Sequence, residues 1–243
     1  MIILGSKSPR RKEILSLSGI SFRVEIKEVE ENIKCDNYLD YPKLTARKKG
    51  EAFNGLYPDD IILTADTIVY LDNEILGKPH SKDEAYEMIK KISGRTHEVI
   101  TGVYIRYKEK VENFTVSTFV TVSKLSEQEI LDYINTKEPY DKAGAYAVQG
   151  IFGKFIERID GDYYNVMGLP INAIYEKIKG DLKWVIHYSL LIFYLTYNFN
   201  NSKVFLTPLI WLRSIPWLAA TPDPIKPPLK LFPAFRAADT SLE

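Results

Sequence analysis

Apolar and polar positions along residues 1–180 follow two different rhythms. Continuous apolar runs at 2–4 and 61–65 are typical of strands buried inside a sheet. Between such runs, apolar side chains recur at helical spacing, as at Ile14 and Leu17. Strands that alternate with helices and short turns favour an α/β fold whose ligands bind at the strand ends.

Capping residues mark where several helices begin. Ser8 and Pro9 predict one start, with the serine as N-cap and the proline in the first helical position, and Gly19 is placed to end that helix. A serine three residues before a glutamate, the spacing of a capping box, occurs at 81–84 and 126–129. The pattern therefore predicts helices over 9–18, 42–53 and 82–93, from 127 onward and over 170–178, with strands over 2–4, 61–65, 98–107, 114–122 and 155–159.

The pattern changes after residue 180. Residues 184–199 are almost all aromatic or aliphatic, and seven of the thirteen prolines lie beyond them. The apolar run is shorter than the about 20 residues that cross a bilayer. Three interpretations are open: an irregular tail packed on the domain or a partner, a weak membrane anchor, or sequence foreign to the domain, such as an altered reading frame. We favour the last and divide the chain into a domain of residues 1–180 and a hydrophobic, proline-rich segment of residues 181–243.

Composition and charge exclude several classes of function. Lysine and arginine number 32, aspartate and glutamate also 32, so no basic excess points to a nucleic-acid partner. The single cysteine, Cys35, excludes an internal disulfide framework and a cysteine-rich zinc site. The apolar stretch at the start is too short for a signal peptide. We expect a reduced, cytoplasmic protein without nucleic-acid or membrane partners.

The segment GSKSPRR at 5–11 has the composition of an anion site. A strand that leads into a helix N-terminus presents unpaired backbone N–H groups and the positive end of the helix dipole, and phosphate is the usual guest. Arg10 and Arg11 stand where acidic residues normally stabilise a helix start. Their repulsion from the dipole costs a few tenths of a kcal/mol, roughly, unless an anion offsets it. A capped surface helix with solvated arginines explains the pattern equally well.

Charged groups farther along the chain could complete such a site. Asp66 lies between two strand-like apolar runs. Its carboxylate either faces a cleft, where a hard cation such as Mg²⁺ would offset the cost of burying the charge, or lies on a turn between two strands. The local pattern alone favours the turn. The acidic run at 28–31 could supply a second carboxylate. Of the basic residues at 47–49, helical geometry lets only one or two face a cleft. Lys78, on a Gly-Lys-Pro turn, can reach a phosphate.

Gln149 is the next-to-last residue of the segment PYDKAGAYAVQG, and its side chain carries both a hydrogen-bond donor and an acceptor, as reading a base edge requires. The sequence contains neither GxxxxGK[ST] nor GxGxxG, so it offers no P-loop and no dinucleotide fingerprint. A GxSxG nucleophile elbow is missing too.

Seven segments in one order and spacing resemble the Maf family of nucleoside triphosphate pyrophosphatases, relatives of the inosine-triphosphate pyrophosphatases. They are SKSPRRKEIL, EVEEN, ADTIV, GKP before a DEA helix, SGRTHEVITGV, EPYDKAGAYAVQG and DGDYYNVMGLP. Each is common alone, whereas the combination is specific and covers about residues 1–179. The resemblance implies an elongated, two-lobed α/β domain with a long twisted mixed sheet and a deep central cleft.

The resemblance also implies the reaction and its residues. Members of the family hydrolyse a nucleoside triphosphate between the α and β phosphates with a divalent cation, Mg²⁺ or Mn²⁺. Transferred to this sequence, the catalytic residues are Asp66 and Lys78, and the metal ligands are Asp66 and Glu31. The residues that bind substrate are Ser8, Arg10, Arg11, Lys49, Thr67 and Gln149.

With glutamine at position 149, the sequence resembles the branch of the family that acts on dTTP and UTP. The branch that acts on 7-methyl-GTP tends to carry glutamate at this position. Hydrolysis of dTTP and UTP is therefore the expected function. The alternatives are a pyrophosphatase for a modified nucleotide, a nucleotide-binding regulator of septum formation that does not cleave its ligand, and an interaction protein that works through the segment 181–243. The expected partner molecule is a nucleoside triphosphate, with a homodimer as a further possibility. Arg11 and Asp66 must then share one cavity.

Overall fold

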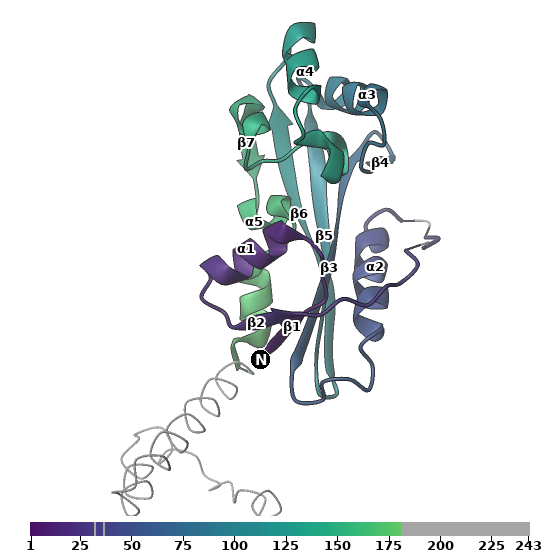
Figure 1. Ribbon diagram of the computed structural model, residues 1–243, viewed down its shortest axis with the longest axis vertical. Helices are drawn as coiled ribbons and strands as arrows, with labels where there is room; N and C mark the ends of the chain where they lie inside the picture. Colours follow the sequence, from purple (N-terminus) through teal and green to yellow (C-terminus); the bar gives the residue numbers. More distant parts are fainter. Residues whose placement is uncertain (32, 36, 181–243) are drawn as a thin grey trace, which may run out of the picture. The chain divides into compact units, whose positions relative to one another are not determined.

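The computed structural model describes residues 1–31, 33–35 and 37–180. Their strands form one seven-stranded mixed sheet of order β2-β1-β3-β5-β6-β7, with β4 paired to β3 (Figure 1). Strand β1 runs parallel to β2 and to the start of β3, and all other pairs are antiparallel. The strands are β1 Ile2–Leu4, β2 Phe22–Val24, β3 Ile61–Leu71, β4 Glu74–Leu76, β5 Thr96–Tyr107, β6 Lys110–Val122 and β7 Ile156–Asp160.

Helices cover the sheet toward both ends of its long strands, with α3 and α4 at one end and α1 and α2 nearer the other (Figure 1). The predicted α/β fold with a mixed sheet is confirmed. The α-helices are α1 Pro9–Leu17, α2 Asp40–Glu51, α3 Lys82–Ile92, α4 Glu127–Ile134 and α5 Tyr163–Met167, and residues 171–180 are helical as well. Three short 3-10 turns are η1 Pro139–Asp141, η2 Ala143–Ala145 and η3 Ile151–Phe155.

Among the described residues, the two larger of the three hydrophobic clusters meet along β3. Ala65 belongs to the cluster that β1, α1 and the last helix form, whereas Val69 belongs to the cluster under α3 and α4. Asp66 and Thr67 lie between these two positions, and both are half-buried. Asp66 and Thr67 thus lie where one apolar cluster ends and the next begins.

The helix-start signals are confirmed by the structure. Ser8 is the N-cap of α1 with Pro9 in its first turn, and at the start of α4 both hydrogen bonds of the capping box are formed. At α3 the box is incomplete, because the Glu84 carboxylate accepts from the N–H of His80 at 2.7 Å instead of that of Ser81. Ser81 still caps the helix through the N–H of Glu84.

Other predictions needed correction. The turn that local pattern favoured at Asp66 is wrong, since β3 continues unbroken from Ile61 to Leu71. Helix α2 begins at Asp40, before the expected start near Pro42. The short elements β2, β4 and α5 were not predicted, because three to five residues are too few to show a period.

The expectations for residues 181–243 lie outside the described part of the chain. Among the described residues, no helix is both long enough and apolar enough to cross a membrane.

Candidate active site

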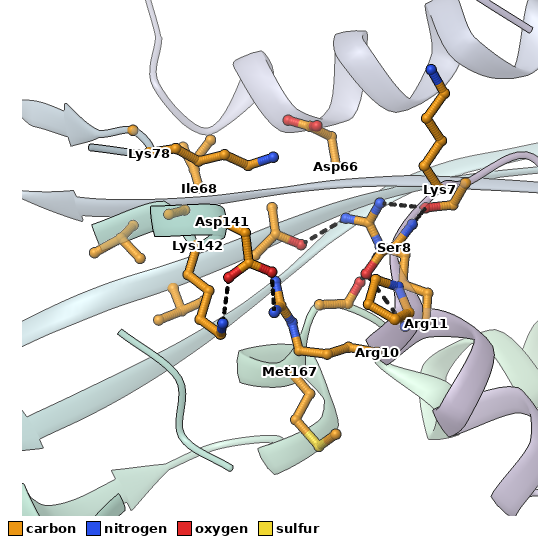
Figure 2. Close-up of a pocket in the computed structure, with 18 of the residues that line it drawn as sticks. Lys7, Ser8, Arg10, Arg11, Asp66, Ile68, Lys78, Asp141, Lys142 and Met167 are labelled. Atoms are coloured by element: carbon orange, nitrogen blue, oxygen red, sulfur yellow. Dashed lines mark hydrogen bonds and ion pairs between the residues drawn. The ribbon is translucent and has the colours of Figure 1, made fainter. Parts of the chain in front are cut away.

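The cavity begins where β1 ends. The N–H of Gly5 donates to the carbonyl of Leu63 at 2.9 Å, and beyond this bond the chain leaves the sheet and turns into α1. The same edge of β3 is paired again only at Val69, by β4. A cavity of about 800 Å³ lies beside this part of β3 (Figure 2). Segments 5–11, 26–31, 66–69, 75–78, 141–149 and 166–168 contribute to its lining.

Arg11 is held in the cavity wall by three uncharged oxygens. Its Nε donates to the carbonyl of Gly168 at 2.7 Å, its Nη1 to Ser6 Oγ at 3.1 Å and its Nη2 to Thr67 Oγ1 at 3.1 Å. Burial lowers the pKa of Arg11, and the nearby carboxylate of Asp66 acts in the opposite direction. A guanidinium remains protonated in proteins, so the wall carries a fixed positive charge.

Ser8 and Arg10 lie at the same helix start. The hydroxyl of Ser8 accepts from the backbone N–H of Arg11 at 3.5 Å, as expected for an N-cap. The guanidinium of Arg10 lies 3.6 Å from the carboxylate of Asp141, which also pairs with Lys142 (Figure 2). Arg10 is therefore bound by one long ion pair, whereas Arg11 has three close acceptors.

Lys49 joins two acidic residues on the opposite side of β3. Its ammonium lies 2.9 Å from Asp66 Oδ1 and 3.0 Å from Glu31 Oε1. The helix that carries it packs tightly on β5, because a Cβ atom on Gly50 would lie 2.1 Å from the ring of Tyr104. Side-chain exposure is 17% for Lys49 and 15% for Asp66, so solvent screens this pair only in part.

The donor set of this cluster fits a hard divalent cation. The Asp66 and Glu31 carboxylates already converge on one positive charge, the Lys49 ammonium. Within residues 1–31, 33–35 and 37–180 there is no group of three or more His, Cys, Asp or Glu side chains that could hold a metal ion. Mg²⁺ is usually held by one or two carboxylates, with substrate phosphates and water as the other ligands.

Lys78, Thr67 and Gln149 line other parts of the same cavity. Lys78 follows β4, and its chain extends toward the space in front of Asp66 (Figure 2). Gln149 is exposed, and its Nε2 donates to Glu13 Oε1 at 3.3 Å. Each predicted site residue thus lies at this cavity, which Arg11 and Asp66 share; the chemical roles stay predictions. The nine residues are Ser8, Arg10, Arg11, Glu31, Lys49, Asp66, Thr67, Lys78 and Gln149.

The sequence did not indicate the residues that hold these groups in place. Gly168, whose carbonyl binds Arg11, ends α5 in the left-handed region at φ 104°, and a Cβ there would lie 3.3 Å from Thr67 Oγ1. A glycine followed by Leu-Pro after an amphipathic run is a helix-end signal that could have located this turn.

A buried pair also supports the cavity wall. The hydroxyl of Tyr146, which lines the cavity, lies 2.7 Å from His97 Nε2. Both residues are buried, and burial lowers the pKa of His97 to about 4. The imidazole is therefore neutral at physiological pH and adds no charge to the site.

Comparison with known proteins identifies relatives of this chain. The family model described as Maf-like protein matches residues 1–180. The dTTP/UTP pyrophosphatase of Acholeplasma laidlawii (strain PG-8A) is 46% identical over 181 residues, which cover 74% of this chain and 95% of that protein. The dTTP/UTP pyrophosphatase of Bacillus cereus (strain G9842) is 48% identical over 179 residues, 73% and 94% of the two chains. Among solved structures, the Ham1 protein of Staphylococcus aureus matches with a TM-score of 0.44 and 13% identity, over 74% of this chain and 98% of that chain.

Proposed function

This chain belongs to the Maf-like protein family, and we propose that it hydrolyses dTTP and UTP to the nucleoside monophosphate and pyrophosphate. Relatives that are 46% and 48% identical carry the name dTTP/UTP pyrophosphatase and are matched over almost their whole length. The observation that carries the proposal is a single cavity that is lined both by fixed positive groups, Arg11 above all, and by the carboxylate of Asp66. Because its substrates are nucleoside triphosphates, we propose a cytoplasmic location.

The positive side of the cavity suits a triphosphate. The start of α1 offers the positive end of the dipole of a nine-residue helix. Arg10, Arg11 and Lys78 add positive charge around it. An arginine binds phosphate oxygens in a two-pronged manner, whereas a lysine acts as a point charge. We assign the phosphates to this side, with Ser8 beside them at the helix start.

The acidic side suits a divalent cation and a proton acceptor. Asp66 and Glu31 are the ligands that would hold Mg²⁺ or Mn²⁺, and such an ion would neutralise phosphate charge and polarise a phosphoryl oxygen. One oxygen of Asp66 contacts Lys49, which leaves the other able to accept a proton.

In the reaction we propose, a water oxygen attacks the α-phosphorus and Asp66 takes the proton that the water loses. The bond between the α-phosphorus and the bridging oxygen breaks, and pyrophosphate leaves with that oxygen. Lys78 stabilises the negative charge that develops on the leaving group. Gln149 and Thr67 contact the nucleoside.

Product identification across a nucleotide panel tests this function. The purified chain is incubated with Mg²⁺ and dTTP, UTP, dCTP or 7-methyl-GTP, and monophosphate, pyrophosphate and inorganic phosphate are quantified. We expect equal amounts of monophosphate and pyrophosphate, with dTTP and UTP cleaved fastest. Fastest cleavage of 7-methyl-GTP would replace the proposed substrates, and tight binding without cleavage would identify a nucleotide-binding regulator.

A further inference from the structure

A row of hydroxyl groups connects the cavity wall to the C-terminal turn of α5. Arg11 Nη2 lies 3.1 Å from Thr67 Oγ1, which lies 2.9 Å from Thr101 Oγ1, which in turn lies 3.1 Å from the carbonyl oxygen of Asn165. Thr67 and Thr101 are direct partners in the pairing of β3 with β5. Thr101 is fully buried, so water does not compete for its hydroxyl.

The chemistry of the two ends sets the direction of every hydrogen bond in this row. A guanidinium only donates, and a backbone carbonyl only accepts. Thr101 gives its single proton to Asn165, so Thr67 must donate to Thr101 while it accepts from Arg11. A hydroxyl has one proton and two lone pairs. Thr67 therefore retains one lone pair, and toward the cavity it can act only as an acceptor.

The turn of α5 that ends the row is itself anchored to the sheet. The side-chain nitrogen of Asn165 donates to the carbonyl of Val99 and to Thr118 Oγ1, each at 3.0 Å. The N–H of Gly168 donates to the carbonyl of Asn165 at 2.9 Å, and the carbonyl of Gly168 binds Arg11 Nε at 2.7 Å. One helix turn thus holds both the hydroxyl row and the guanidinium.

We propose that Thr101 is a positioning residue that makes Thr67 a hydrogen-bond acceptor at the cavity wall, and that Thr67 recognises a hydrogen-bond donor of the substrate. This inference rests on the proposed function and deepens it. In dTTP the donors are the imide N3–H of the base and the 3′-hydroxyl of the sugar, and UTP has the 2′-hydroxyl in addition. Phosphate and base carbonyl oxygens do not fit, because they only accept.

Substrate analogues that lack one donor each test this assignment. For the wild type and Thr101→Val, which keeps the side-chain shape and removes the hydroxyl, kcat/KM is compared among dTTP, N3-methyl-dTTP and 3′-deoxy-dTTP. Without Thr101 as acceptor, the Thr67 proton becomes free to point into the cavity. The preference for dTTP over the analogue that lacks the recognised donor is then expected to fall about tenfold. A fall confined to the N3-methyl pair assigns the base, and one confined to the 3′-deoxy pair assigns the sugar.

Three further variants separate positioning from general stability. Thr101→Ser keeps the hydroxyl and is expected to keep the preference. Thr64→Val is the matched control, since this hydroxyl is as fully buried as that of Thr101 and lies on the neighbouring strand β3, but donates to the carbonyl of Ala46 at 2.6 Å, outside the row. Thr67→Val removes the acceptor directly, and it tests the same recognition if Thr101→Val does not fold. The double variant is expected to lose no more of the preference for dTTP over the analogue than either single variant does.

The inference is overturned if Thr101→Val retains both preferences, as Thr64→Val is expected to. Each ratio is also measured from dissociation constants by calorimetry. Nucleotides that bind without release of pyrophosphate would then refute the proposed function, while the binding ratios still decide the role of Thr101.

Discussion

The two sides of the cavity hold their cations by opposite means. On one side Arg11 donates to three uncharged oxygens, and on the other Lys49 lies between the carboxylates of Asp66 and Glu31. Uncharged acceptors orient a guanidinium without cancelling its charge. Carboxylates neutralise the charge of an ammonium group, and they can bind another cation in its place. We therefore expect Arg11 to bind an anion, and the carboxylates around Lys49 to exchange the ammonium for a metal ion.

The largest expected effect is on the carboxylate side. Asp66→Asn keeps the shape of the side chain but removes its charge and its ability to take a proton. We expect kcat to fall by about 10²–10⁴-fold with circular dichroism and melting temperature little changed. Asp72→Asn is the matched control, because Asp72 is exposed and paired with Arg95 away from the cavity. Full turnover in Asp66→Asn would remove Asp66 from the mechanism.

The comparison also predicts that a buried basic side chain with a single uncharged hydrogen-bond partner, where Arg11 has three, loses its charge. Within the described residues the His97 ring is hydrogen-bonded only to the hydroxyl of Tyr146, its Nδ1 atom has no hydrogen-bond partner, and burial lowers its pKa from 6.5 to about 4. The unfolded chain therefore binds a proton between pH 6.5 and 4 that the native protein does not. The resulting contribution to stability is complete above pH 6.5 and is lost as the pH falls to about 4, by up to about 3 kcal/mol.

Urea unfolding at several pH values measures this loss in the wild type and in His97→Gln. The variant removes the imidazole but keeps all the carboxylates. The difference between wild type and variant in the slope of the free energy of unfolding against pH therefore isolates His97. Identical slopes would show that the imidazole is already protonated in the native protein.

Arg11→Lys tests whether the geometry of the uncharged acceptors matters beyond charge. An ammonium keeps the positive charge but cannot reach three separate oxygens in the plane of a guanidinium. We expect kcat/KM for dTTP to fall by roughly ten- to a hundredfold. Arg10→Lys should have a smaller effect, since Arg10 makes one ion pair at 3.6 Å. Equal losses in the two variants would mean that only charge counts.

The smallest expected effect concerns competition between cations. Lys49→Gln removes the ammonium that lies between Asp66 and Glu31, so their carboxylates should bind Mg²⁺ or Mn²⁺ more tightly, by about tenfold, in the absence of nucleotide. Calorimetric titration measures this affinity. Arg47→Gln is the control, because Arg47 lies on the same helix but pairs with Glu51. Unchanged affinity in Lys49→Gln would show that the lysine does not compete.

Local chemistry explains why some elements could be predicted from the sequence. An N-cap such as Ser8 and a capping box such as 126–129 act within four residues, so their signals are complete in the sequence. The strand at Asp66 was missed because what stabilises a carboxylate there lies elsewhere. Asp66 stands opposite Gly102 in the pairing with β5, and its charge partner Lys49 comes from α2.

The order of motifs along the chain was enough to predict the family and the residues that line the cavity, because each motif is a short run whose residue types can be read directly. The arrangement around each cation required the folded chain. Gly168 reaches Arg11, Asp66 and Glu31 reach Lys49, and Thr101 meets Thr67 only through strand register and helix packing. Hydrogen bonds depend on distances of about 3 Å. Such distances between residues far apart in the chain are set by tertiary structure alone.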